Sequence, residues 1–354
     1  MNIPSGAATK PSGWLHSALR WAPGLIISAV AVVLLLGVVD LELLAKAWQQ
    51  ANLLYLVPGA ALLLLAMVAR GGAWHVLSGR LIRPARAFWV LNAGYLINAI
   101  LPLRLGDLAR ALLAGSPRAG ETSTLTASAA LSSVVLERVL DLVCTFGLVM
   151  FALPVVAGQA WGGRTIVWST AVAISGVAGV LVAGLLRGPL VRWLSARAPA
   201  GSPAAKWVAR IERFLRGLEA LRDWRIVLPA MLLLILTWFI WLLEYTVLLR
   251  AFLPQATLAD GLLALVGSAL GMMIPSSPGG LGVYEAAVVG ALAVIGIQSE
   301  TALAYAITVH VLNSAGVIGL GWIGLVREGR TLERLVHDVL KVSTGRGAND
   351  APSA

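Results

Sequence analysis

The chain has 354 residues, of which 58% are hydrophobic and only 12% are charged. A soluble globular protein carries about a quarter charged residues, so this composition excludes that class and indicates an integral membrane protein. The formal net charge of +10 is therefore interpreted as cytoplasmic loop charge, and nucleic acid is excluded as a partner. One cysteine and four scattered histidines show no disulfide or metal-ligand spacing, so neither a metal nor another cofactor is expected.

Long apolar runs predict the membrane spans, because about 20 apolar residues cross the hydrocarbon core. Residues 1–20 are polar and are expected to lack structure. The rest of the first half is interpreted, in chain order, as spans over 21–39 and 52–69, a basic loop with Arg70, Arg80, Arg83 and Arg86, a broken apolar segment over 87–116, and a long apolar run over 122–156.

The second half follows a similar order. It is interpreted as a span over 164–186, a polar stretch over 187–225, a span over 226–252, a second broken apolar segment over 258–298, a last span over about 301–326, and a charged tail over 327–354 that is expected to lack structure. Within the polar stretch, apolar residues at helical spacing predict an amphipathic segment over about 204–222 that lies on the cytoplasmic leaflet.

Loop charges predict the orientation of the chain. Lysine and arginine concentrate in the loops at 70–86 and 187–225 and in both termini, so these segments are expected in the cytoplasm. Both ends then lie on one side, and the number of crossings must be even. Treating 87–116 and 258–298 as re-entrant helical hairpins gives an all-α polytopic membrane protein with about six full spans in one transmembrane domain over 21–326.

The two broken segments share a phrase. Residues 100–108 read ILPLRLGDL and residues 273–281 read MIPSSPGGL, each with two apolar residues, a proline, three residues, a glycine, one residue and a leucine. Hairpins that enter from opposite faces would form an inverted-topology repeat, and Pro/Gly-broken segments of this kind mark binding sites in secondary transporters. The alternative is a chance match in a chain with 37 glycines and 16 prolines.

The first broken segment carries charge at helical spacing. Arg104, Asp107 and Arg110 would lie along one side of a helix that starts after Pro102. Guanidinium groups match phosphate oxygens, so Arg104 and Arg110 are candidates for binding a phosphate, with Asp107 fixing one of them. The alternative is that they anchor the hairpin among cytoplasmic headgroups.

The long apolar run contains Glu137, Arg138 and Asp141, and ionisable residues at membrane depth need a partner or water. Glu137 and Asp141 share a helix face, which predicts a proton or counter-ion site. A structural ion pair is the alternative, and it is favoured for Arg138 with Asp141, which leaves Glu137 as the better functional candidate. The offset between the two phrases places His310 opposite Glu137 in the repeat.

The second broken segment, residues 275–282, reads PSSPGGLG and cannot form a regular helix. Its free N–H groups, followed by a helix that opens near Val283, predict an anion site. The residues assigned to binding there are Ser276, Ser277, Gly279 and Gly280. Glu285 lies in the first helical turn, where it is either a helix cap or a proton site coupled to the substrate.

Three phrases together resemble the lysylphosphatidylglycerol synthase transmembrane family, also called the flippase-like domain family. They are LPLRLGDLARA at 101–111, LERVLD at 136–141 and PSSPGGLGVYE at 275–285. The resemblance covers roughly residues 20–326 and implies a role in lipid translocation or in lipid supply to envelope biosynthesis. In the best-known members this region carries aminoacylated phosphatidylglycerol across the membrane beside a soluble aminoacyltransferase domain.

Two departures separate the chain from that pattern. The residues after 326 are too few for a soluble synthase domain, so aminoacyl transfer is not expected. Many members also have an arginine after a tyrosine in the last span, whereas Tyr305 is followed here by Ala306, and the nearest ionisable residue is His310. Some stand-alone relatives accompany hopanoid or glycolipid biosynthesis, which widens the range of expected cargo.

The leading interpretation is a non-enzymatic, flippase-like lipid transporter of the bacterial inner membrane, with both termini in the cytoplasm. The expected partners are membrane lipids, either an anionic phospholipid or an isoprenoid or glycolipid, and self-association into a homo-oligomer is left open. One alternative is a non-transporting partner of a lipid-modifying or hopanoid or glycolipid biosynthesis enzyme. The other is an intramembrane serine hydrolase with Ser276 or Ser277 as nucleophile and His310 as base, although the chain has no GxSxG elbow.

Overall fold

The computed structural model describes residues 13–101, 104–116, 125–160, 192–193, 196–197 and 223–343. All regular secondary structure in these ranges is helical, which confirms the predicted all-α class. The span predicted over 164–186 and the amphipathic segment predicted over 204–222 lie outside the described residues.

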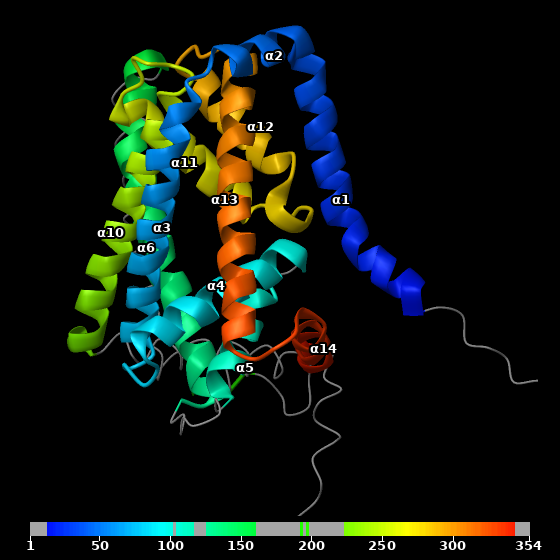
Figure 1. Ribbon diagram of the computed structural model, residues 1–354, viewed down its shortest axis with the longest axis vertical. Helices are drawn as coiled ribbons and strands as arrows, with labels where there is room; N and C mark the ends of the chain where they lie inside the picture. Colours follow the sequence, from blue (N-terminus) through cyan, green and yellow to red (C-terminus); the bar gives the residue numbers. More distant parts are fainter. Residues whose placement is uncertain are drawn as a thin grey trace, which may run out of the picture.

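The first half of the chain contains α1 (Gly13–Val38), α2 (Leu41–Gln50), the short 3₁₀ helix η1 (Leu53–Tyr55), α3 (Leu56–Leu77), α4 (Pro84–Ile100), α5 (Gly106–Gly115) and α6 (Ala127–Ala160). The second half contains α10 (Trp224–Leu249), α11 (Leu258–Met273), the 3₁₀ helix η3 (Pro278–Gly280), α12 (Val283–Ala293), α13 (Ser299–Arg327) and α14 (Leu332–Ser343). Figure 1 labels the α-helices on the ribbon.

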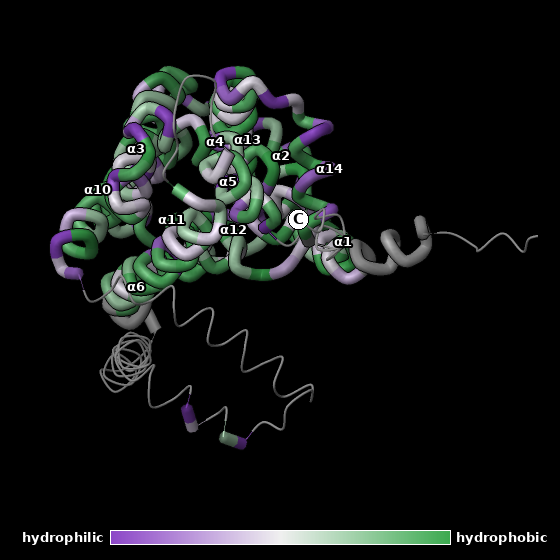
Figure 2. The backbone as a smooth tube through the Cα atoms, turned by 90° about the horizontal axis from the view of Figure 1, so that it is seen from below, coloured by the Kyte–Doolittle hydropathy of each residue, from purple (hydrophilic) through white to green (hydrophobic). Residues whose placement is uncertain are grey.

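Three described helices are long and apolar enough to cross a membrane: α3 together with η1, α10 and α13. The pair α1 and α2, bent by 85°, gives up to a fourth span. These helices, and the stretches of hydrophobic residues coloured green along the backbone in Figure 2, support a multi-pass membrane protein. The full arrangement of six spans and two re-entrant hairpins remains a prediction.

The two broken segments occupy opposite ends of the helix bundle. In Figure 1, α4 and α5 lie at the end where α3 and α13 finish, whereas α11 and α12 lie at the end where α13 begins. Helix α4 packs against α13, and α12 packs against α13 as well. The segments approach each other inside the bundle, because α4 also contacts η3 in the second break.

Both terminal segments that were expected to lack structure are partly helical. Helix α1 begins at Gly13, within the predicted N-terminal segment, and α14 occupies part of the predicted tail. Leu335 and Val339 of α14 are buried with residues of α4 and α5. Burial of such apolar side chains stabilises the helix, and the high charge of the tail hid this pattern in the sequence.

The predicted end of the second span at residue 69 is wrong. Helix α3 continues to Leu77 and carries Arg70 into the interior, where only 2% of its surface is exposed. Arg86 is also buried, in α4, and its guanidinium lies 2.9 Å from the carboxylate of Glu328. Both arginines have carboxylate partners, so the chain can bury residues that a charge count assigns to a loop.

Candidate functional site

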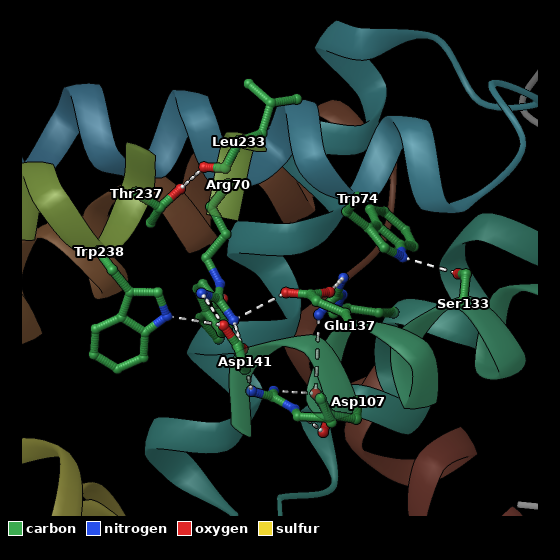
Figure 3. Close-up of polar contacts among 12 residues, drawn as sticks. Arg70, Trp74, Asp107, Ser133, Glu137, Asp141, Leu233, Thr237 and Trp238 are labelled. Carbon is green, nitrogen blue, oxygen red and sulfur yellow. Dashed lines mark hydrogen bonds and ion pairs between the residues drawn. The ribbon is translucent and has the colours of Figure 1, made fainter. Parts of the chain in front are cut away.

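Six ionisable side chains meet between α3, α5 and α6, and we call them the ion cluster. They are Arg70 of α3, Asp107 and Arg110 of α5, and Glu137, Arg138 and Asp141 of α6. Figure 3 shows Arg70, Asp107, Glu137 and Asp141 turned toward one another. Three arginines face three carboxylates, so the ion cluster has no formal net charge.

Glu137 is the most deeply buried carboxylate of the ion cluster. Its side chain is fully buried, and the Nη2 atom of Arg110 donates a hydrogen bond to its Oε2 atom at 2.6 Å. The Nη2 atom of Arg70 lies 3.0 Å from the other oxygen, Oε1. Two guanidinium groups therefore neutralise one carboxylate, as burial of a charge requires.

Arg110 is as fully buried as its partner Glu137. Its guanidinium carbon Cζ lies 4.4 Å from the ring centroid of Trp74, which places the cation over an aromatic face. The Trp74 indole is fixed in turn, because its Nε1 atom donates to the Ser133 hydroxyl at 3.0 Å. The predicted lipid-binding arginine Arg110 is therefore held inside the protein by α3 and α6.

Asp141 pairs mainly with Arg70, which the sequence analysis had placed in a loop. Arg70 contacts both carboxylate oxygens of Asp141, and its Nε atom donates to the Tyr95 hydroxyl. The Trp238 indole of α10 donates to the same carboxylate at 3.3 Å. Asp141 thus joins α3, α6 and α10, and it does not act as an isolated carboxylate.

Asp107 and Arg138 form the most exposed part of the ion cluster. Arg138 donates to Asp107 from Nη2 at 2.7 Å and from Nε at 3.1 Å, which is a bidentate pairing of a guanidinium with a carboxylate. Its predicted partner, Asp141, lies farther away, at 3.8 Å from Nη1. Asp107 is also 4.0 Å from Arg110. The fixing residue predicted for the first segment therefore serves mainly Arg138.

The glycine of the first phrase allows α5 to approach α4. A Cβ atom on Gly106 would lie 1.9 Å from the carbonyl oxygen of Gly94. The backbone N–H of Gly106 also donates to the Asn98 side chain at 2.7 Å. This close contact holds α5 where Asp107 and Arg110 reach the ion cluster.

Arg104 stands apart from the other arginines of this region. Its side chain is exposed, and its backbone has a positive φ of 53°, which is uncommon for a residue with a side chain. Its Nη2 atom donates to the carbonyl oxygen of Met272 at 3.0 Å. No carboxylate among the described residues forms an ion pair with it. Arg104 therefore links the first broken segment to the second, and its guanidinium has no ion-pair partner among the described residues.

The second broken segment is built on glycine turns and on a backbone contact with α1. Gly279, Gly280 and Gly282 have positive φ values of 74°, 76° and 82°, a conformation that favours glycine. The N–H of Ser277 donates to the Ser28 hydroxyl of α1 at 3.0 Å, and the N–H of Gly280 donates to the Ser277 carbonyl at 2.9 Å. The anion-binding role of Ser276, Ser277, Gly279 and Gly280 remains a prediction.

Glu285 fulfils the cap interpretation and has a second partner as well. One oxygen, Oε2, accepts a hydrogen bond from the Gly282 N–H at 2.6 Å, and the other, Oε1, lies 2.6 Å from Nδ1 of His310. The His310 ring also lies beside Tyr284, with ring centroids 4.5 Å apart. Two residues that the sequence analysis considered separately are therefore one pair, and no serine of the described residues hydrogen-bonds His310.

Comparison with known proteins agrees with the phrases that carry the resemblance. A model of the lysylphosphatidylglycerol synthase transmembrane region matches residues 21–321. Comparisons with curated proteins and with solved structures give no match.

Proposed function

The chain belongs to the lysylphosphatidylglycerol synthase transmembrane family, and from this premise we propose that it moves a lipid with an anionic headgroup between membrane leaflets. The family indicates a membrane protein of lipid or envelope biosynthesis. The finer proposal is a flippase-like transporter in the bacterial inner membrane, with both termini in the cytoplasm. The cargo is a phospholipid or a related envelope lipid.

Arg104 is the observation that carries this proposal. The ion cluster balances its own charges, whereas Arg104 is exposed and bonded only to the neutral Met272 carbonyl among the described residues. A guanidinium with free donors is suited to a phosphate or another anionic headgroup. Because Arg104 lies where the two broken segments touch, a lipid bound to it would contact both of them.

The other predicted site residues support this junction in the proposal. Asp107 and Arg110 hold the first segment through the ion cluster, and Glu285 with His310 fixes the start of α12. We place the first segment as a hairpin entering from the cytoplasm and the second as a hairpin entering from outside. Their positions at opposite ends of the bundle in Figure 1 favour that inverted arrangement.

The test is lipid movement in liposomes that contain the purified full-length protein and fluorescent phospholipids with several headgroups. We expect the protein to accelerate exchange between leaflets, and Arg104→Gln to slow it about tenfold, as the loss of one charged hydrogen bond of about 1.4 kcal/mol implies. Arg80→Gln is the matched control, because Arg80 is also exposed and also has a positive φ, of 59°.

Exchange no faster than in protein-free liposomes, for every headgroup, would overturn the transport proposal. In that case the alternative of a non-transporting partner becomes the better one, and co-purification with a lipid-modifying enzyme tests it. Equal rates for Arg104→Gln and Arg80→Gln, both above the protein-free rate, would leave transport standing and remove Arg104 from the site.

A further inference from the structure

Glu244 of α10 belongs neither to the ion cluster nor to the Glu285–His310 pair. Its side chain is fully buried, and neither of its carboxyl oxygens accepts a well-aligned hydrogen bond from a described residue. An ionised carboxylate in such a place loses its hydration and gains no partner in return, which is strongly unfavourable. The two carboxyl oxygens therefore need a proton, a hydrogen-bond donor or a cation.

The groups around Glu244 are polar but uncharged. Three buried tyrosines, Tyr245 on α10, Tyr284 on α12 and Tyr305 on α13, lie in the same part of the interior. The Tyr245 and Tyr284 hydroxyls bind each other at 3.0 Å, and the Tyr305 hydroxyl donates to the Tyr245 carbonyl at 3.0 Å. Helix α11 adds the Ser268 hydroxyl, which lies close to Tyr245. None of these groups supplies a cation.

The charged residues of the neighbouring helices are engaged elsewhere. Helices α3 and α6 pack against α10, but their Arg70 and Asp141 bind each other and face the Trp238 indole. On α12 and α13, Glu285 and His310 also bind each other. Within the described part of the chain, Glu244 therefore has no counter-ion.

Asn313 of α13 is the polar neighbour of the Glu244 carboxyl group. Its side chain lies beside the Glu244 carboxyl, and its oxygen Oδ1 is buried without a hydrogen-bond partner. The two Glu244 oxygens and the Asn313 oxygen are three acceptors, and the Asn313 NH₂ group beside them cannot satisfy all three. A single proton on Glu244 corrects this, because the acid O–H can donate to the amide oxygen while the amide NH₂ can donate to the other carboxyl oxygen.

We propose that Glu244 and Asn313 form a proton-binding site between α10 and α13, and that Glu244 holds the proton in the structure described here. Binding converts the carboxylate and one proton into a neutral acid. Release leaves a charge that needs water, so it requires α10 and α13 to separate locally. This proposal needs no contact with lipid and is independent of the transport proposal.

Infrared spectroscopy of the purified full-length protein in detergent tests the protonation state directly. We expect a carboxylic-acid carbonyl band at neutral pH that shifts in deuterated water and disappears in Glu244→Gln. Glu42→Gln is the control, because Glu42 is an exposed carboxylate on α2, and the band should persist there. Absence of the band from the unsubstituted protein at neutral pH, or its persistence in Glu244→Gln, would overturn the proposal.

Thermal unfolding at several pH values gives a second measurement. The folded state prefers the protonated acid, so rising pH should lower the melting temperature of the unsubstituted protein more than that of Glu244→Gln. Stabilisation by sodium chloride over choline chloride that is lost in Glu244→Gln would overturn the proposal in favour of a metal cation. If Glu244→Gln does not fold, loss of the infrared band from the unsubstituted protein at high pH still supports the site, and its absence at every pH refutes it.

Discussion

The two broken segments of this chain solve the same problem by different means. Each interrupts a helix inside an apolar protein, where every polar group needs a partner. The first segment, between α4 and α5, leads into Asp107 and Arg110, which Arg138 and Glu137 of α6 neutralise. The second, between α11 and α12, carries little charge and relies on glycine turns, nearby hydroxyls and the Glu285 cap.

The difference lies in how far the supporting contacts reach. The ion cluster joins three helices. The loss of one charge therefore leaves its partner on another helix without a counter-charge. The second segment is held by contacts close in sequence and by single bonds from Ser28 of α1, Arg104 and His310 of α13. We therefore expect substitutions in the first region to destabilise the protein more than substitutions in the second.

The largest effect is expected for Arg110→Met. It leaves Glu137 buried and paired only with Arg70, and removal of one partner from a buried ion pair costs about 3–5 kcal/mol. The measurement is the free energy of unfolding in mixed micelles. The double variant Arg110→Met/Glu137→Leu should recover much of the loss, because it removes both charges.

A loss below about 1 kcal/mol for Arg110→Met, a value typical of exposed ion pairs, would contradict the comparison between the regions. It would mean that Glu137 is reached by water despite its burial. No recovery in the double variant would indicate that packing around Trp74, rather than charge, accounts for the loss.

The next largest effect is expected where the backbones of α4 and α5 come close together in the first region. Gly106→Ala places a Cβ atom against the Gly94 carbonyl, so α5 must move away from α4, at a cost of about 1–3 kcal/mol for overpacking. Gly290→Ala is the matched control in α12, since nothing lies within 4 Å of its added Cβ. That control should be neutral or slightly stabilising, because alanine favours helix more than glycine does.

Thermal unfolding of both glycine variants in the same detergent measures this difference. Equal melting temperatures would show that the close contact between α4 and α5 does not limit the packing. In that case the glycine of the first phrase would need another explanation than close approach.

The fold class and both helix breaks could be predicted because they depend on local composition. Apolar runs indicate helices in a membrane, and residues 102–106 and 275–282 hold the prolines and glycines that interrupt them. The resemblance to the family is likewise carried by short phrases, and the match over residues 21–321 confirms it. The six-span layout depends on residues outside the described ranges and remains a prediction.

The partners within the site could not be predicted, because they are distant in sequence. Arg70 was assigned to a loop on charge alone, yet it is the main partner of Asp141, 71 positions away. The sequence indicates both Glu285 and His310 as candidates, but only the packing of α12 on α13 shows that they form a pair. The presence of an ionisable residue in an apolar run is a usable signal, whereas the identity of its partner is not.

A smaller effect is expected at the cap of the second region. Glu285→Ala leaves the Gly282 N–H and the His310 ring without their acceptor, and loss of a helix cap costs about 0.5–2 kcal/mol. Glu285→Gln should lose less, because glutamine can also serve at this capping position. Unfolding free energies of the two variants decide this, and an equal loss would show that charge on Glu285 matters more than its hydrogen bond to Gly282.

The smallest effect is expected for Ser277→Ala, also in the second region. The removed hydroxyl donates only a long bond of 3.4 Å to the Leu281 carbonyl, so the change in unfolding free energy should stay within about 0.5 kcal/mol. The backbone N–H of Ser277, which binds Ser28, is retained. Because the fold is preserved, the variant isolates the predicted contact with lipid. Slower lipid exchange in liposomes would then reflect lost binding at the second segment, and an unchanged rate would remove the Ser277 hydroxyl from the site.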